Sequence, residues 1–387
     1  MTAVLVVLLA ACSTSTTLPP PPRTAATAPV DLSAPGVRHL EYVFPAGSMQ
    51  VFDVDHDLRL VESVPLPTGR GVRGVAASVV ARRVFVSYGG DGGRNGNGSL
   101  LAYDLSARTI VWTRHFAHGV DSMAASDDGS RIFVPGGEGA RDGRWYVLDG
   151  RSGRQVGVIH GGAGAHNTVI GASGRFVYLG GRDHDFLVVA DERTGAIVRR
   201  VGPLRAGVRP FTVNGRETIA YTTATGFLGF QVCDLRTGRV LFTQDVPGFG
   251  WDPRRFATTA PSHGISLSPA ERELYVMDAP NAAVHVFDVS GVPDRPPRLV
   301  ATVPTSQPMI GDESPCGVDC ARDGWLRHSR DGRLVFVGDA GDVIGTRAHR
   351  VVATLPVLRD TKKSIEIDWV DERPVFTTSR YGLGHVR

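Results

Sequence analysis

The sequence predicts an all-β protein, a seven-bladed β-propeller closed by N- and C-terminal strands in one shared blade. Two observations lead to this prediction. Short apolar segments that end in Asp recur along the chain, and a tight polar turn follows each of them. The 387 residues also include 47 Gly and 25 Pro, which favours many short strands joined by turns.

The strand that ends in Asp is the clearest repeat. Six copies end at Asp53, Asp104, Asp149, Asp191, Asp234 and Asp288, and a seventh ends at Gly345. Successive copies are 51, 45, 42, 43, 54 and 57 residues apart, close to the ~40–50 residues of a four-stranded propeller blade. We interpret these Asp residues as turn-forming rather than catalytic, because Asp side chains accept hydrogen bonds from nearby backbone N–H groups.

The other strands follow from the same alignment. Inner strands rich in small residues are expected at 74–78, 122–126, 167–171, 210–214, 264–268, 325–329 and 364–368. Second strands are expected at 84–88, 132–135, 176–179, 219–222, 274–277, 334–337 and 375–378.

One blade is expected to combine both ends of the chain. The segment 364–380 supplies its first and second strands, and the segment 47–64 supplies its third and fourth strands. Closing the ring in this way removes an open sheet edge that would invite aggregation. We therefore expect one domain over residues 37–387.

One repeat resembles a known family. The segment SHGISLSPAERELYVMDAPNAAVHVFDVSG, residues 262–291, is similar to the YVTN-type repeats of bacterial surface proteins and to YncE-like exported propellers. Tyr275 and Val276 match the repeat, whereas Met277 and Asp278 stand where the family has Thr and Asn. The resemblance implies a propeller fold. It leaves the activity open, because propellers of this shape include lactonases, haem and quinone oxidoreductases and binding modules.

The N-terminus predicts export. Residues 1–11 contain an apolar run that is shorter than the ~20 residues needed to span a bilayer and is typical of a signal peptide. The run leads into Leu9-Ala10-Ala11-Cys12, which resembles the lipobox of bacterial lipoproteins, in which the cysteine receives the lipid. No Lys or Arg precedes the run. A signal peptide cleaved without lipidation, or an incidental cysteine, therefore stay as alternatives.

A tether is expected behind the anchor. Residues 12–36 are rich in Ser, Thr, Pro and Ala, and such a composition buries too little apolar surface to fold. We thus expect a protein that is exported and lipid-anchored to the bacterial cell envelope, touches the membrane only through its lipid, and is a monomer.

Three further cysteines are interpreted by their surroundings. Cys316 and Cys320 share one loop, and export permits a disulfide between them, with two free thiols as the alternative. The CxxCH motif of covalent haem attachment is absent. Cys233 lies in an apolar strand, where a buried thiol is expected.

No sequence signature of catalysis is present. The chain lacks the GxSxG and HExxH motifs, and its net charge of +3 gives no argument for nucleic-acid binding. We expect neither a nucleic-acid partner nor a cofactor.

The candidate site is the mouth of the central channel. Aligning the blades places Arg73, Asp121, His166, Arg209 and His263 at matching positions where the chain enters an inner strand. Further polar or aromatic candidates around the same mouth are Glu138, Arg141, Arg182, Asp183, His184, Asp278, Asn281, Trp325 and Lys363. We predict a ligand-binding site for an anionic small molecule or an envelope protein, because guanidinium groups pair well with carboxylates and phosphates.

Other interpretations of the mouth stay open. The polar residues could fill the wet end of a channel. His166 and His263, with His184, could instead support metal or cofactor chemistry, which would suit a propeller enzyme such as a lactonase-type hydrolase or a metal-, haem- or quinone-linked oxidoreductase. In a binding site, histidines would add positive charge below neutral pH.

The anchor gives the first testable prediction. Cys12→Ser should release the protein from membranes into the soluble exported fraction, because the thiol that carries the lipid is gone. Membrane fractionation measures the release, and Cys233→Ser is the matched control that should stay membrane-bound. A mature N-terminus without lipid at Cys12, found by mass spectrometry, would contradict the assignment.

Overall fold

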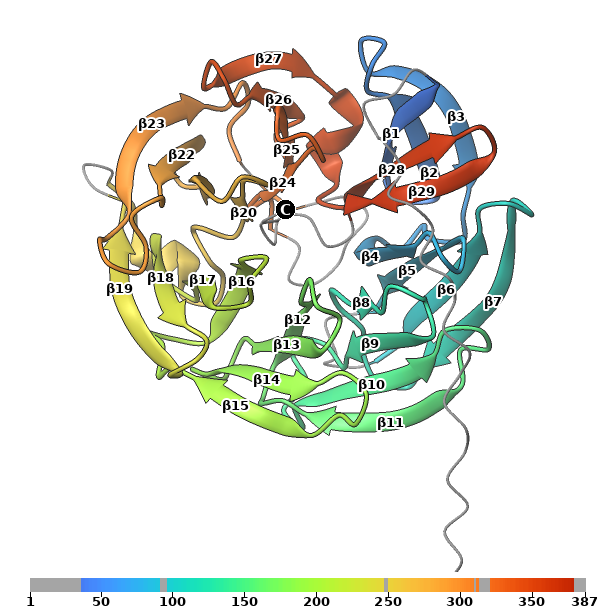
Figure 1. Cartoon of the computed structure of the whole chain (residues 1–387), viewed down its shortest axis with the longest axis horizontal. Coiled ribbons are helices and arrows are strands. Elements are labelled where there is room, and N and C mark those ends of the chain that lie inside the picture. The colour runs from blue at the N-terminus through green and yellow to red at the C-terminus, as the bar shows by residue number, and fades with distance from the viewer. Residues whose placement is uncertain (1–35, 91–95, 247–249, 310, 313–320, 379–387) are drawn as a thin grey trace, which may run out of the picture.

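The computed structural model describes residues 36–90, 96–246, 250–309, 311–312 and 321–378. These residues form seven antiparallel sheets arranged as blades around a central axis (Figure 1). The predicted signal peptide, all but the last residue of the tether, and Cys12, Cys316 and Cys320 lie outside the described residues. Within the described part of the chain, no helix has the length and apolar character needed to cross a membrane.

Six blades each contain four strands in chain order from the axis outward. The first two comprise β4 (Val72–Ser78), β5 (Arg83–Gly89), β6 (Gly98–Asp104) and β7 (Thr109–Phe116), then β8 (Ala124–Ala125), β9 (Arg131–Pro135), β10 (Arg144–Asp149) and β11 (Gln155–His160). The next two comprise β12 (Ala165–Ile170), β13 (Phe176–Gly181), β14 (Leu187–Asp191) and β15 (Ile197–Val201), then β16 (Val208–Val213), β17 (Ile219–Ala224), β18 (Gly229–Asp234) and β19 (Arg239–Asp245).

A short 3₁₀ segment precedes the fifth of these blades, and another follows the sixth. They comprise β20 (Ile265–Leu267), β21 (Glu273–Asp278), β22 (Ala283–Asp288) and β23 (Arg298–Pro304), then β24 (Trp325–His328), β25 (Leu334–Gly338), β26 (Asp342–Gly345) and β27 (Arg350–Thr354). The 3₁₀ segments are η1 (Pro253–Phe256) and η2 (Pro356–Asp360).

The predicted turn role of the repeated Asp is confirmed. Oδ1 of Asp149 accepts hydrogen bonds from the backbone N and the hydroxyl of Ser152, at 2.8 and 2.6 Å. Asp191 binds Thr194 in the same way, with both donors at 2.8 Å. The third strands of all seven blades end at the residues that the repeat predicted, including Gly345.

The core lies between neighbouring blades. Phe85 and Leu100 of one blade pack in a single apolar cluster with Ile132 and Tyr146 of the next. Equivalent clusters occupy the other blade interfaces, and in one of them Phe230 contacts Phe287 edge-on with ring centroids 5.0 Å apart. Each blade therefore holds its neighbours, and the positions of the inner strands around the axis depend on the closed ring.

The seventh blade is made from both chain ends, as predicted. It is a five-stranded sheet in the order β29 (Arg373–Thr377), β28 (Ser364–Val370), β1 (Val37–Val43), β2 (Ser48–Asp53) and β3 (Arg59–Pro65). Figure 1 shows the first and last parts of the chain side by side in this blade. β1 and β28 pair in antiparallel register from Val37 opposite Val370 to Val43 opposite Ser364.

The division of strands in this blade differs from the prediction. The segment 375–378 was expected to be the second strand, but that place belongs to β1, and β29 flanks the other side of β28. The sequence of β1, VRHLEYV, mixes charged residues with apolar ones, so its strand pattern is weak. Its Leu40 and Tyr42 are nevertheless buried in one cluster with Ile365 and Ile367 of β28.

Buried ionisable side chains lie where β1 pairs with β28, which we call the closure. Glu41 lies directly opposite Glu366, and both are fully buried. Burial, followed by the charges of Asp368 and Glu41, raises the pKa of Glu366 well above its ordinary value. The hydrogen bond from His39 Nδ1 to Asp368, 2.8 Å long, raises the pKa of His39. In the folded protein both groups therefore hold a proton more tightly than in the unfolded chain.

The raised pKa of Glu366 predicts that the pairing of β1 with β28 contributes less to the stability of the fold as pH rises. A group whose folded pKa is raised contributes stability that is complete below its unfolded pKa, 4.5 for Glu366, and that is lost as pH rises through the folded pKa. Glu366→Gln mimics the protonated carboxyl, so the variant should gain stability relative to the native protein as pH rises from about 5 to 9.

Urea unfolding of both proteins across that range measures the difference, in which all other titrating groups cancel. Glu62→Gln is the matched control, because Glu62 is part of a more exposed pair with Arg108. A constant difference between Glu366→Gln and the native protein would contradict the prediction.

Candidate functional site

A small cavity lies where the chain enters the inner strands. Its lining side chains come from all seven blades, and its volume is about 50 Å³. It is lined by Gly71, Val72, Arg73, Asp121, Glu138, His166, Arg182, Arg209, Thr259, His263, Ala321, Asp323, Lys362 and Lys363. We call it the entry cavity. All five residues of the predicted ring, Arg73, Asp121, His166, Arg209 and His263, are therefore brought together.

Irregularities in strand pairing determine the direction of three of these side chains. The pairing register of β4 with β5 shifts between Val72 and Gly74, which leaves Arg73 as the extra residue. The register of β12 shifts between Ala165 and Asn167, around His166. The register of β16 shifts between Val208 and Phe211, around Arg209. A β-bulge redirects a side chain out of the regular alternation, and here it turns three equivalent positions toward the axis.

Glu138 is the centre of the charge arrangement. It lies in the loop between β9 and β10, and its Oε2 is 2.9 Å from Nη1 of Arg209 and 3.2 Å from Nη1 of Arg182. Burial opposes ionisation, but the charges of Arg209, His166, Arg182 and Arg73 outweigh it and hold the pKa of Glu138 at about 2. Glu138 is therefore a carboxylate at all physiological pH values and orders the arginines around it.

Asp121 orients His166. Oδ1 of Asp121 accepts the backbone N–H of Ser122 at 2.8 Å, and Oδ2 lies 3.0 Å from Nδ1 of His166. Because a carboxylate only accepts, Nδ1 carries the proton of this bond. Ser122 and Asn167 form a parallel bridge between the two blades, which keeps Asp121 and His166 in register. The other ring nitrogen, Nε2, is buried and has no hydrogen-bond partner in the part of the chain that the structure describes.

His263 belongs to the opposite wall. Its Nδ1 is 3.0 Å from the carbonyl oxygen of Gly324 and 3.3 Å from Oδ1 of Asp323, and its ring centroid is 6.0 Å from that of His166. Burial, and after it the charges of Arg209 and Lys362, lowers the pKa of His263 well below its ordinary value. The expectation that this histidine adds positive charge below neutral pH is therefore wrong.

Lysines complete the ring on the side of the closing blade. Nζ of Lys362 donates to the carbonyl of Ala321 at 2.8 Å and lies 3.3 Å from Asp323 and 3.1 Å from Asp339. Nζ of Lys363 lies 4.0 Å from the centroid of the Trp325 ring, which is a cation–π contact. Trp325 in turn lies 5.7 Å from His263, centroid to centroid.

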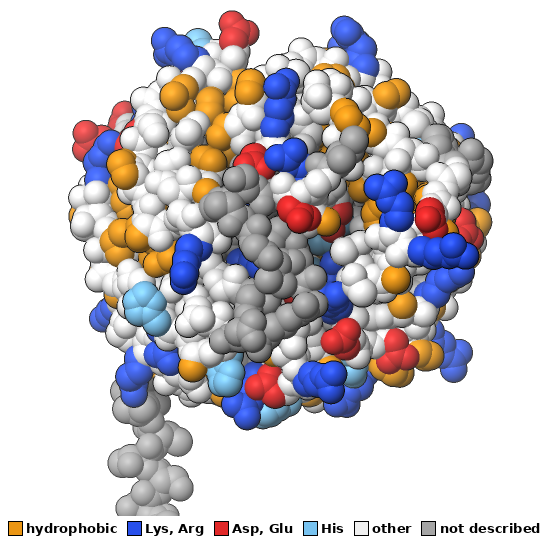
Figure 2. Space-filling view, turned by 180° about the vertical axis from the view of Figure 1, so that it is seen from behind, with side chains coloured by type: hydrophobic (Ala, Val, Ile, Leu, Met, Phe, Trp, Pro, Cys, Tyr) orange, Lys and Arg blue, Asp and Glu red, His pale blue; other side chains and the backbone are white. Residues whose placement is uncertain are grey.

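The charges of the cavity do not cancel among its lining residues. Five Lys or Arg and three Asp or Glu line it, an excess of two positive charges, and Asp339 behind Lys362 offsets one of them. On the face of the molecule seen in Figure 2, Lys and Arg are interspersed with Asp and Glu.

Some predicted residues lie elsewhere. Glu138, Arg182 and Lys363 line the entry cavity as expected, but Arg141, Asp183 and His184 do not. Nδ1 of His184 is 3.0 Å from the carbonyl oxygen of Phe186, so this histidine does not join His166 and His263. Asp278 and His285 form a buried pair within their own blade, 3.0 Å apart.

Asp323 and Lys362 line the cavity but were missed by the sequence comparison. Both lie two residues before an inner strand, Asp323 before Trp325 and Lys362 before Ser364. This position relative to the inner strand could have identified both residues, but the long loops that precede the two strands made the alignment of these blades uncertain.

Comparison with known proteins does not assign the chain to a family. Neither a family model nor a curated protein sequence matches the chain. What is known of the site therefore comes from its own geometry.

Three groups of the cavity could chelate a metal. Ligand atoms of Asp121, Glu138 and His166 lie within 4.8 Å of one another. Two arginines, however, already contact the carboxylate of Glu138, and their charge repels a cation. This set also differs from the expected one, because it contains His166 without His263 or His184.

The pairing of Glu138 gives a testable prediction. Glu138→Ala leaves two buried guanidinium groups without their shared carboxylate, and loss of one partner of a buried ion pair costs about 3–5 kcal/mol of unfolding free energy. Chemical denaturation measures this loss. Glu62→Ala removes the carboxylate of a more exposed ion pair, that with Arg108, and should cost no more than about 1 kcal/mol. Equal stability of Glu138→Ala and the native protein would show that the arginines do not depend on Glu138.

Proposed function

We propose that this propeller is a binding module for a small anionic group, which it holds in the entry cavity. The observation that carries the proposal is a pair of buried nitrogens without partners. Among the described residues, neither Nε2 of His166 nor Nε of Arg209 has a hydrogen-bond partner, and both residues line the cavity. His166 is 6% exposed and Arg209 is 3% exposed, so bulk water does not compensate either atom.

Unsatisfied buried polar groups are rare and costly in folded proteins. A carboxylate or phosphate oxygen beside the two nitrogens would accept from Nε of Arg209 and, when the imidazole is charged, from Nε2 of His166. Such an anion would also offset the excess positive charge of the lining. The volume of about 50 Å³ suits a head group of this size rather than a whole large ligand.

The histidine gives the binding a pH dependence. Nδ1 of His166 donates to Asp121, so Nε2 is an acceptor in the neutral ring and a donor in the charged ring. An anionic oxygen can therefore accept from Nε2 only when the ring is charged, and lower pH favours the charged ring. The lowered pKa of His263 disfavours a charge on that histidine, so the proposed pH dependence is assigned to His166.

The cellular setting is part of the proposal. The apolar run and the Leu9-Ala10-Ala11-Cys12 sequence support export and lipid anchoring, and the repeat supports a relationship to YncE-like exported propellers. On this view the module presents its cavity outside the cytoplasm to an anionic small molecule or to an acidic group of an envelope protein.

An enzyme is the alternative. An imidazole with a carboxylate at Nδ1 and a bare Nε2 is the arrangement of a general base. Because Nε2 has no partner in the structure, the described residues supply no nucleophile for it to activate. The alternative would thus require a substrate or a water molecule as the nucleophile.

Titration calorimetry with acetate and with inorganic phosphate tests the proposal. We expect binding that weakens with added salt, because paired charges are screened, and that strengthens from about pH 7.5 to pH 5.5. Arg209→Lys keeps a cation beside Glu138 but removes Nε, so it should weaken binding at least tenfold without unfolding the protein. His166→Gln should remove the pH dependence.

Arg83→Lys is the matched control, because Arg83 donates to the carbonyl of Gly150 and does not line the cavity. It should bind like the native protein. Lack of binding to both anions, or one transition-metal ion per chain retained through purification and lost in His166→Gln, would overturn the proposal.

A further inference from the structure

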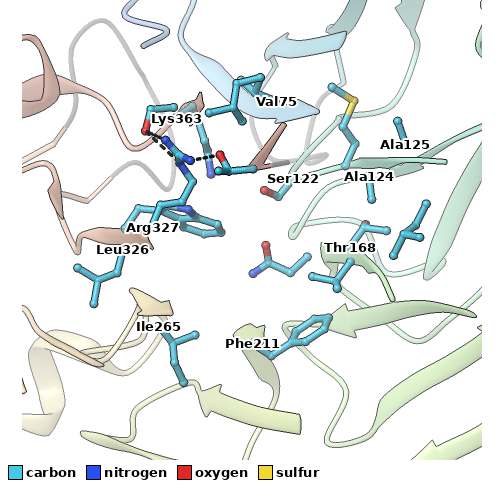
Figure 3. A pocket seen from close by; sticks show the side chains of 18 residues that line it. Val75, Ser122, Ala124, Ala125, Thr168, Phe211, Ile265, Leu326, Arg327 and Lys363 are labelled. Carbon is cyan, nitrogen blue, oxygen red and sulfur yellow. Dashed lines mark hydrogen bonds between the residues drawn. The ribbon is translucent and has the colours of Figure 1, made fainter. Parts of the chain in front are cut away.

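A second cavity continues the entry cavity along the axis. It has a volume of about 110 Å³ and shares Lys363 with the entry cavity. Figure 3 shows its side chains converging from the inner strands of different blades. We call it the channel cavity.

The two cavities are lined by successive residues of the same inner strands. On six blades the residue two positions after a charged or imidazole side chain of the entry cavity is a hydrophobic residue of the channel cavity. The pairs are Arg73 and Val75, Asp121 and Met123, Arg209 and Phe211, His263 and Ile265, Asp323 and Trp325, and Lys363 and Ile365. A level rich in charged groups is therefore stacked on a level in which apolar side chains alternate with polar ones.

Several polar side chains of the channel cavity already have partners. Arg327 binds Glu41 and Thr378, and the hydroxyl of Thr168 accepts from Nε1 of Trp145 at 2.8 Å. The amide nitrogen of Asn167 has no hydrogen-bond partner among the described residues, so its two N–H donors are available. Apolar side chains such as Met123, Phe211, Ile265 and Leu326 form most of the remaining wall, together with Ser122, Ser364 and Lys363.

We propose that the ligand is an amphiphilic carboxylate, whose head occupies the entry cavity and whose short apolar tail extends into the channel cavity. This inference rests on the proposed function and adds the class of ligand. Apolar surface buried in the channel would contribute affinity in proportion to its area, which a purely hydrophilic anion would not gain.

The size of the channel cavity limits the tail. An apolar cavity of ~150 Å³ accommodates benzene, and the channel cavity is smaller, about 110 Å³. A chain of a few carbons therefore fits and a long fatty acyl chain does not. Ala124, on β8, lies in the wall of this cavity (Figure 3), so a larger side chain there would fill it.

The test is a calorimetric series of straight-chain carboxylates from acetate to octanoate. Affinity should rise roughly three- to fourfold per added methylene, and should stop rising at a chain of roughly four to five carbons. In Ala124→Leu the rise should disappear while the affinity for acetate stays within about twofold. Ala107→Leu, at an exposed turn, is the control that should keep the rise.

A second variant tests the inference independently, in case Ala124→Leu does not fold. Phe211→Leu enlarges the channel cavity and should move the plateau to longer chains. An affinity independent of chain length, which is the result for a water-filled channel, would overturn the inference and leave the proposed function standing. So would a rise that persists in Ala124→Leu. Lack of binding to acetate and phosphate alike would instead overturn the proposed function.

Discussion

The pairing of β1 with β28 is the constraint on which the rest of the structure depends. It joins residues more than 300 positions apart in the chain and closes the ring of blades. The apolar clusters between blades hold each inner strand at its angle around the axis only when the ring is complete. The entry cavity draws side chains from every blade, so its geometry is a property of the whole ring rather than of any one repeat.

The closure and the cavity solve similar electrostatic problems in different ways. In the closure, two glutamates face each other, and the raised pKa of Glu366 allows one of them to be neutral. In the cavity, Glu138 is kept ionised by the arginines around it. Protonation of Glu366 and pairing of Glu41 with Arg327 relieve the first cluster, whereas ion pairing relieves the second. The second cluster leaves Nε of Arg209 unpaired among the described residues beside the entry cavity.

Sequence reasoning succeeded where the physical cause is local. The Asp at the end of each third strand forms its turn with residues two or three positions away, so the repeat predicts strand ends and blade number. The ring of Arg73, Asp121, His166, Arg209 and His263 also followed from equivalent positions in the blades. These residues share a position relative to the inner strands, and position alone brings them to the axis.

Sequence reasoning failed where partners are distant. The strand β1 was missed because Arg38, His39 and Glu41 dilute its apolar pattern, and their burial depends on partners in the C-terminal part of the chain. The salt bridge of Arg209 with Glu138 joins residues 71 positions apart, so a side chain expected at a solvated channel end is in fact buried and paired. The lowered pKa of His263 has a similar origin, because it results from burial in the assembled ring and then from the charges of Arg209 and Lys362.

The bulges at Arg73, His166 and Arg209 separate recognition from architecture. An extra residue in a bulge is outside the regular hydrogen-bond ladder, so its side chain can be exchanged while the flanking pairs keep their register. Such positions can diverge between descendants of one ancestral propeller without a new backbone. A scaffold of this kind can acquire different ligand preferences by a few substitutions at the rim of its axis, and those same positions are where a designer would begin.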